Sequence, residues 1–101
     1  MAKGFWLARL DIKDQASYDE YRKRNAGPFA KFGGRFIVRG GNAEGVIGPR
    51  RQHNVIIEFE SYEKALACYR SPEYQRAKPL RLAHSVCDFV IVEGYEGAQP
   101  K

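Results

Sequence analysis

The sequence predicts an α+β fold of the ferredoxin-like type, with a four-stranded antiparallel sheet and the order β-α-β-β-α-β. Three observations support it. Apolar residues alternate with period two in segments 5–12 and 54–59, as in strands whose side chains point to alternate faces. Helical stretches are available to cover one face of the sheet. The other face also carries apolar residues, so we expect a second copy to cover it, giving a dimeric α/β barrel.

The first part of the chain is expected to form a strand over residues 4–12 and a helix from Asp14 to about Phe32. Asp14 is a suitable N-cap. An inner stripe of residues three or four positions apart follows it: Tyr18, Tyr21, Asn25, Phe29 and Phe32. Pro28 predicts a kink or a break near residues 26–27. Gly33 and Gly34 are expected to end the helix, since glycine adopts the left-handed C-cap conformation without strain.

The rest of the chain is expected to contain three further strands and two helices. The strands are predicted over Arg35–Arg39, His53–Phe59 and residues 87–93, with a glycine-rich loop over residues 40–52. Ser61 is the expected cap of one helix. A capping serine, a proline and an acid follow one another in residues 71–73, which indicates that a third, shorter helix begins there. Pro79 is expected to disturb its end.

Period-two alternation assigns each strand residue to one face of the sheet. The helix-covered face is expected to be apolar: Ala8, Leu10, Phe36, Val38, Val55, Ile57, Phe59, Val90 and Val92. The opposite face is expected to mix apolar and charged residues: Phe5, Leu7, Arg9, Ile37, Arg39, Ile56, Glu58, Phe89, Ile91 and Glu93. This second surface is the one that predicts packing of two copies, sheet against sheet.

Length, charge and cysteine content limit the class of protein. A chain of 101 residues has room for one core, so we expect one domain over residues 1–95 and a loose tail over 96–101. The net charge of +5 comes from basic residues that are dispersed along the chain, which disfavours nucleic acid as a partner. Nucleic-acid binding through residues 22–24 and 76–81 stays an alternative. Cys68 and Cys87 lack metal-ligand spacing and are expected to be reduced thiols. The sequence shows no signal peptide or membrane span, which predicts a cytoplasmic protein without a membrane partner.

Three charged residues are expected on the sheet face opposite the helices, where charge is costly unless it is paired or bound. Arg9, Arg39 and Glu58 are therefore the first candidates for a site. Neighbouring strands would allow Arg9 to pair with Glu58, and Arg35 is also expected near Glu58. One interpretation is an anion pocket, in which arginine offers two donors to a carboxylate or phosphate. The alternative is an ion-pair network that fixes the register of the dimer.

Tyrosines and histidines supply the other candidates. Tyr69 and Tyr74 belong to helices unusually rich in tyrosine, where hydroxyl groups either enter a pocket or end at the surface of the core. His53 and His84 are suited to proton transfer near neutral pH, although no nucleophile or second ligand is expected beside either. Motifs for a phosphate loop, a nucleophile elbow or a metal centre are not found, so neither a cofactor nor a metal is expected.

Several stretches resemble one known family. They are residues 33–41, 55–59 and 67–75, together with the opening Gly4-Phe5-Trp6 and the closing residues 90–94. The chain is similar along nearly its whole length to the bacterial family catalogued as domain of unknown function 1330. The resemblance implies a ferredoxin-like protomer in a dimeric α/β barrel, and it implies no activity or site residues. The wider superfamily is similar to small monooxygenases acting on quinols or haem, to lactone isomerases and to ligand-sensing domains, a kinship of fold alone.

The combined expectation is a cytoplasmic homodimer with a small-molecule pocket, acting as a cofactor-independent enzyme on an anionic or carbonyl-bearing metabolite. Arg9 and Arg39 would anchor the metabolite, and Glu58, the candidate catalytic residue, would orient it or move a proton. Tyr69 and Tyr74 would form the wall of the pocket. The alternative is a non-catalytic ligand-binding or sensing module that uses the same pocket.

Overall fold

The computed structural model describes residues 2–101 and contains four strands and three helices in the order β-α-β-β-α-α-β. All neighbouring strands are antiparallel, and the sheet order is β2-β3-β1-β4, so the first and third strands are central, as predicted. The fold is therefore ferredoxin-like. The elements are β1 (Gly4–Ile12), α1 (Gln15–Phe32), β2 (Arg35–Arg39), β3 (His53–Phe59), α2 (Tyr62–Arg70), α3 (Pro72–Ala83) and β4 (Ser85–Glu93).

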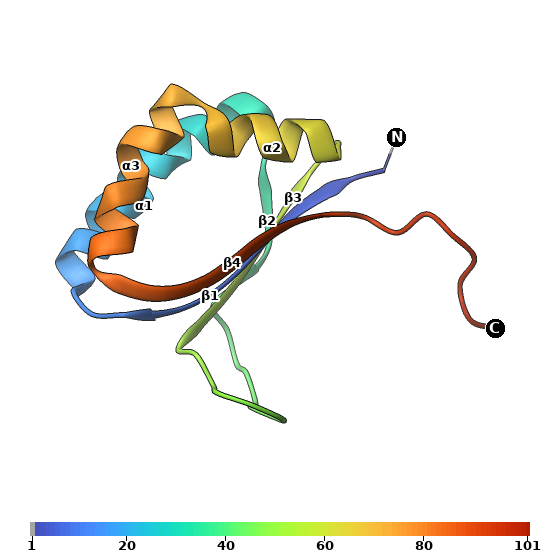
Figure 1. Cartoon of the computed structure of the whole chain (residues 1–101), viewed down its shortest axis with the longest axis horizontal. Coiled ribbons are helices and arrows are strands. Elements are labelled where there is room, and N and C mark those ends of the chain that lie inside the picture. The colour runs from blue at the N-terminus through green and yellow to red at the C-terminus, as the bar shows by residue number, and fades with distance from the viewer. Residues whose placement is uncertain (1) are drawn as a thin grey trace.

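The helices form a layer over one face of a curved sheet (Figure 1). The loop between β2 and β3 projects on the other side of the sheet, and the residues after β4 extend away from it. Trp6 on β1 is central to the core between the two layers. Its indole Nε1 donates a hydrogen bond to the Ala65 carbonyl at 2.9 Å, and its ring lies 4.9–5.5 Å from those of Phe29, Tyr74 and Phe59. No helix within residues 2–101 has the length and hydropathy needed to cross a membrane.

The ends of the helices follow the local sequence. The Ser61 hydroxyl accepts a hydrogen bond from the Lys64 amide at 3.1 Å and caps α2. The Ser71 hydroxyl accepts one from the Tyr74 amide at 3.3 Å and caps α3. Gly33 ends α1 with a left-handed φ of 73°, the conformation for which glycine is favoured. These three predictions are confirmed.

Of the kink or break predicted for α1 near residues 26–27, the break does not occur. The helix is continuous from Gln15 to Phe32, with Pro28 inside it. Proline removes one backbone donor from a helix interior, and the helix continues past it into a turn that packs on the core. Phe29, directly after the proline, is buried and its ring lies 5.6 Å from that of Phe36. Pro79 likewise lies inside α3 without ending it.

A β-bulge in β2 changes which way the later side chains of that strand point. After the bulge that follows Phe36, Val38 lies opposite Ile56 and Arg39 lies opposite Val55. Residues directly opposite each other in antiparallel strands share a face. Arg39 therefore faces the helices, and Val38 faces away from them. The prediction had these two residues the other way round, because strict alternation makes no allowance for the additional residue of a bulge.

The orientation of β4 also differs from the prediction. Its register with β1 turns Phe89 and Ile91 toward the helices, where both pack against the core. Val90 and Val92 face the opposite side and are 53% and 40% exposed. Both sets of alternate residues in this strand are apolar, so the hydrophobic pattern could not distinguish the two faces.

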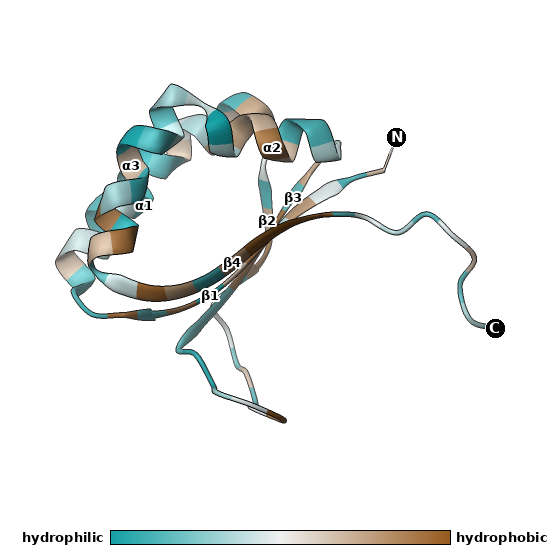
Figure 2. Ribbon diagram, in the orientation of Figure 1, coloured by the Kyte–Doolittle hydropathy of each residue, from teal (hydrophilic) through white to brown (hydrophobic). Residues whose placement is uncertain are grey.

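The sheet face opposite the helices, called here the outer face, keeps the predicted mixture of apolar and charged residues, but the bulge in β2 and the orientation of β4 change its members. Val38 replaces Arg39 on this face, and valines of β4 replace Phe89 and Ile91. The ribbon of β4 is strongly hydrophobic over much of its length (Figure 2), because the residues on both of its faces are apolar. The apolar residues of the outer face are Phe5, Leu7, Val38, Ile56, Val86, Val90 and Val92.

Candidate functional site

A cavity of about 340 Å³ lies between the helix layer and the sheet. This volume is at the lower end of the range for small-molecule sites, about 300–1,000 Å³. Its walls are mainly apolar and aromatic, and include Trp6, Leu10, Phe29, Phe36, Val55 and Phe89. Polar side chains from α1, α3, β2 and β3 also line it: Gln15, Tyr18, Tyr21, Arg22, Asn25, Arg39, His53, Tyr74 and Arg81.

Two tyrosine hydroxyls meet in the inner part of this site. Tyr21 comes from α1 and Tyr74 from α3, and their oxygens lie 2.7 Å apart. Burial raises the pKa of both phenols above its ordinary value, so both are neutral at physiological pH. The pair brings two hydroxyl hydrogens, of which its mutual hydrogen bond uses one. The other hydroxyl hydrogen is left for the Asn25 amide, which also forms a hydrogen bond with Tyr21, or for an acceptor in the cavity.

A buried arginine lies beside the tyrosine pair. Arg81 on α3 is only 4% exposed, and its guanidinium carbon lies 5.0 Å from the centre of the Phe89 ring and 5.8 Å from that of Tyr21. Nη1 donates to the Cys87 sulfur at 3.2 Å, whereas Nε is buried without a hydrogen-bond partner. No aspartate or glutamate of residues 2–101 forms an ion pair with Arg81.

Three further polar groups line the cavity at the β2–β3 side. The imidazole of His53 stacks with the Tyr18 ring, with ring centres 6.2 Å apart and planes 20° from parallel. Arg39 lies over Phe36, with its guanidinium carbon 4.1 Å from the ring centre. The site thus combines aromatic walls with a histidine, three arginines and a tyrosine pair, which are groups that can donate hydrogen bonds to acceptor oxygens.

The structure separates the residues that the sequence grouped into one site. Arg39 and Tyr74 line the cavity. Tyr69 packs behind it, with its ring 5.4 Å from that of Tyr74, and its hydroxyl accepts a hydrogen bond from Lys78 at 3.4 Å. Arg9 and Glu58 lie on the outer face, because they neighbour inward-facing residues of β1 and β3.

The predicted Arg9–Glu58 pair does not form. Glu58 lies opposite Phe5 in the sheet. It forms ion pairs with Lys3 at 2.7 Å and with Arg35 at 3.4 Å, the second of which was predicted. The Lys3 hydrogen bond is the main reason that the pKa of Glu58 is lowered. A carboxylate held ionised by two cations on the outer face is not placed to transfer protons in the cavity.

Arg81 is the main site residue that the sequence reasoning missed. It was grouped with the exposed basic residues of the 76–81 stretch. Helical spacing contained the signal, because residues 74, 77 and 81 lie three and four positions apart and share one face. Tyr74 and Ala77 on that face are fully buried.

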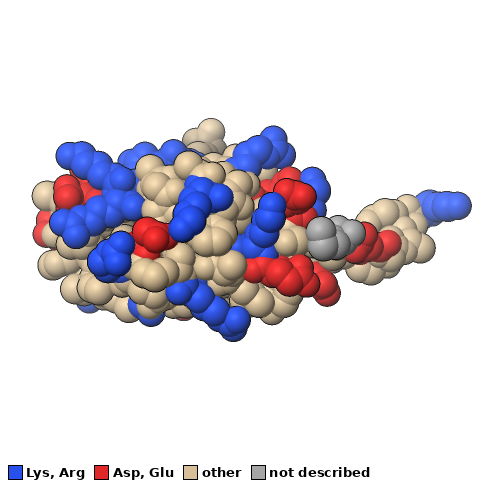
Figure 3. All heavy atoms as spheres, turned by 90° about the horizontal axis from the view of Figure 1, so that it is seen from above, with Lys and Arg blue, Asp and Glu red and all other residues tan. Residues whose placement is uncertain are grey.

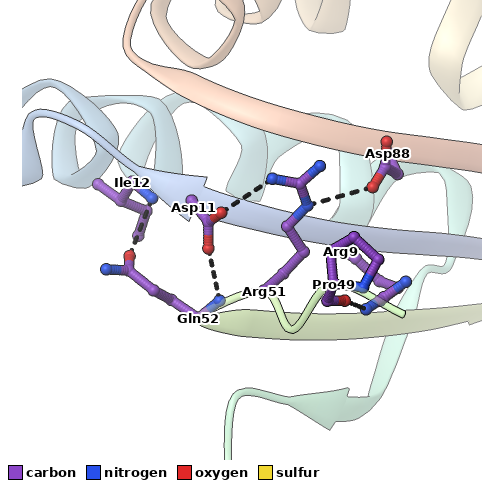
Figure 4. Close-up of polar contacts among 7 residues, drawn as sticks. All are labelled: Arg9, Asp11, Ile12, Pro49, Arg51, Gln52 and Asp88. Atoms are coloured by element: carbon purple, nitrogen blue, oxygen red, sulfur yellow. Dashed lines mark hydrogen bonds and ion pairs between the residues drawn. The ribbon is translucent and has the colours of Figure 1, made fainter. Parts of the chain in front are cut away.

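A polar cluster on the outer face holds the base of the β2–β3 loop (Figure 4). The Asp11 carboxylate accepts hydrogen bonds from the Gln52 amide at 2.7 Å and from Arg51 at 2.9 Å. These two contacts lower the pKa of Asp11. Arg51 also reaches Asp88 on β4 at 3.2 Å, and the Arg9 guanidinium donates to the Pro49 carbonyl at 2.7 Å. The loop is thereby tied to β1 and β4.

Other classes of site have less support among residues 2–101. No group of three or more histidine, cysteine or acidic residues there has the arrangement of a metal site. Cys68 and Cys87 are free thiols. Over the helix layer, basic side chains are interspersed with acidic and uncharged ones (Figure 3), without the single basic patch that nucleic-acid binding requires.

Comparisons with known proteins point to a family without an assigned activity. A family model described as Domain of unknown function (DUF1330) matches residues 3–95. No sequence among the curated proteins matches the chain.

Solved structures show a similar fold at low sequence identity. A protein of unknown function from Rhodopseudomonas palustris has a TM-score of 0.78 at 18% identity, covering 95% of this chain and 85% of that one. SnoaB, a cofactor-independent oxygenase from Streptomyces nogalater, has a TM-score of 0.65 at 14% identity and covers 100% of both chains. A dimeric ferredoxin-like protein of unknown function from Bacteroides fragilis has a TM-score of 0.59 at 11% identity, covering 90% and 95%.

Proposed function

The chain belongs to the family described as domain of unknown function DUF1330, and we propose that it is a cytoplasmic homodimer that binds a small anionic or carbonyl-bearing metabolite. The metabolite occupies the cavity between the sheet and helices α1 and α3. Residues 1–95 form the one domain that carries this site.

The observation that carries the proposal is the convergence of polar groups on an apolar cavity. Tyr21, Tyr74, Arg39 and His53 come from four different elements and line the same space of about 340 Å³. Apolar walls with a few converging polar groups are the usual composition of a ligand site. Arginine and tyrosine donate hydrogen bonds to carbonyl or anionic oxygens, so the ligand carries at least one such oxygen.

We assign the proton-transfer role in this cavity to His53. The sequence analysis gave that role to Glu58, which lies on the outer face. His53 lines the cavity and stacks on Tyr18, which fixes the plane of the imidazole. Abstracting a proton from a carbonyl-bearing metabolite requires a base within hydrogen-bond reach, and a histidine in the cavity is suited to this. A binding or sensing module that uses the same cavity without turnover is the second candidate.

The homodimer is supported by the outer face. Phe5, Leu7 and Ile56 lie on the central strands of that face, and an apolar surface of this kind is usually covered. The dimeric ferredoxin-like structure from Bacteroides fragilis supports the same assembly. The β2–β3 loop lies on this side of the sheet (Figure 1), and its tip residues Val46 and Ile47 are 84% and 93% exposed. In the proposed dimer this tip flanks the second copy.

The test is to recover the metabolite from the protein. Protein incubated with a small-molecule extract is separated by gel filtration, denatured and examined for released compounds by mass spectrometry. An Ala8→Leu variant fills the cavity and is expected to release none, whereas Leu82→Lys, on the exposed surface of α3, is expected to behave as wild type. Prolonged incubation that converts the compound supports an enzyme, and recovery of it unchanged supports a binding module. Equal recovery from the Ala8→Leu variant would exclude the cavity as the site.

A further inference from the structure

The charge of Arg81 has no compensating carboxylate among residues 2–101. Burying an ion costs several kcal/mol unless it is paired or fully hydrogen-bonded. Arg81 is 4% exposed, its Nε has no partner, and its nearest described neighbours are two aromatic rings and the Cys87 thiol. Burial raises the pKa of that thiol, so Cys87 is neutral and supplies no negative charge. A buried, uncompensated cation is a cost that packing alone does not explain.

Arg81 lines the same cavity as Tyr21 and Tyr74. An anion in the cavity would meet the guanidinium and the one hydroxyl hydrogen that the tyrosine pair does not use. A carboxylate suits both groups. Arginine can donate two parallel N–H hydrogen bonds to its two oxygens, and the tyrosine hydroxyl can donate a third hydrogen bond. Four further aromatic rings line the space, those of Trp6, Phe29, Phe36 and Phe89, and they favour a flat ring as the body of the ligand.

We infer that Arg81 is the anchor of an anion site and that the ligand is a small aromatic carboxylate with one negative charge. This inference rests on the proposed function and specifies its ligand class. The single charge of the ligand compensates the buried charge of Arg81, whereas Arg22 and Arg39, which also line the cavity, are exposed to solvent. The aromatic body fills the apolar part of the cavity. The Tyr21–Tyr74 pair donates the additional hydrogen bond.

Two probes of nearly equal shape test the charge requirement in the wild-type protein. 2-Naphthoate and 2-naphthamide differ in carrying a carboxylate or a neutral amide. Binding is followed by calorimetry and by the backbone NMR shifts of Gly40 and Ile57, which line or adjoin the cavity. We expect 2-naphthoate to bind about tenfold more tightly or better, as for a hydrogen bond to a charged group. Equal affinity for the two probes would overturn the anion assignment and leave the cavity as a ligand site. If neither probe shifts the signals of Gly40 and Ile57, the proposed function is contradicted as well.

An Arg81→Met variant separates a ligand anchor from a structural residue. Methionine keeps much of the apolar stem and removes the charge, so the free protein is expected to keep or raise its melting temperature while losing the preference for 2-naphthoate. Arg76→Met is the matched control, because Arg76 lies on the same helix and is exposed; it is expected to change neither property. A variant that unfolds, or one that keeps the preference, would contradict the inference.

Discussion

The hydroxyl groups of Tyr21 and Tyr74 form a hydrogen bond of 2.7 Å between α1 and α3, although 53 positions separate the two residues in the chain. This contact joins the two helices over the cavity. Both residues are buried, at 5% and 0% exposure, so neither hydroxyl can exchange its partner for bulk water. The pair is therefore both a structural link and the innermost polar feature of the candidate site.

Removing both hydroxyls of this pair is expected to cost less than the sum of the two single removals. Tyr21→Phe leaves the Tyr74 hydroxyl without its partner, and an unsatisfied buried polar group costs about 1–3 kcal/mol. Tyr74→Phe has the corresponding effect on Tyr21. In the double variant no unpaired hydroxyl remains, so the loss is smaller than the sum of the two single losses. Urea unfolding of the three variants measures this coupling, and strictly additive losses would show that the bond is absent.

Stability is expected to fall at alkaline pH because of a buried thiol. Burial raises the pKa of Cys68 to about 12, whereas a cysteine in an unfolded chain has a pKa of about 8.5. Between these two values the unfolded state binds fewer protons than the native state. The free energy of unfolding therefore decreases as pH rises, and the Cys68 thiol contributes about 1.4 kcal/mol of this decrease per pH unit. Below the pKa of the unfolded chain, the contribution of Cys68 does not change with pH.

Urea unfolding at several pH values between 7 and 10 checks this dependence. A Cys68→Ala variant is expected to be less stable at neutral pH, because it leaves a small cavity, and to lose stability less steeply above about pH 9. The raised pKa values of Tyr21 and Tyr74 add to the decline only at higher pH. Equal slopes for the variant and the wild type would show that Cys68 is not the group responsible.

The polar cluster under the β2–β3 loop is expected to control the mobility of that loop. Asp11 accepts hydrogen bonds from both the Gln52 amide and Arg51, whereas Asp88 accepts one, from Arg51. Asp11→Asn is therefore expected to increase amide hydrogen exchange at Gln52 and tryptic cleavage at Arg50 and Arg51 more than Asp88→Asn does. Comparable exchange rates in the two variants would assign the restraint of the loop to other contacts.

A charge at the centre of the outer face is expected to dissociate the proposed dimer. Leu7 and Ile56 lie opposite each other on the two central strands, so a lysine at position 7 would be buried between two copies without a partner. Sedimentation of Leu7→Lys is expected to give one chain of 11.5 kDa, and the wild type and Leu82→Lys are expected to give two. A dimeric Leu7→Lys protein would place the interface elsewhere.

The sequence was sufficient where local chemistry decides the structure. Ser61, Ser71 and Gly33 occupy the cap positions that were predicted for them, because capping depends on a few neighbouring residues. The order of strands in the sheet also followed, since few arrangements satisfy the sequence of strands and helices.

The sequence was not sufficient to predict features that depend on pairing between distant segments of the chain. The direction of Arg39 depends on a bulge that appears only when β2 pairs with β3. The face of Val90 depends on the register between β4 and β1, because both sets of residues in β4 are apolar. The burial of Arg81 was indicated by helical spacing but was hidden by the expectation that arginine is exposed.

Native mass spectrometry of protein purified gently from cells tests the central claim, a dimer with a ligand in each cavity, most directly. We predict a dimer of 11.5 kDa chains with added mass that dissociates on activation, and loss of that mass in the Ala8→Leu variant. A monomer would contradict the assembly, and a dimer that stays free of ligand after saturation with a small-molecule extract would contradict the site.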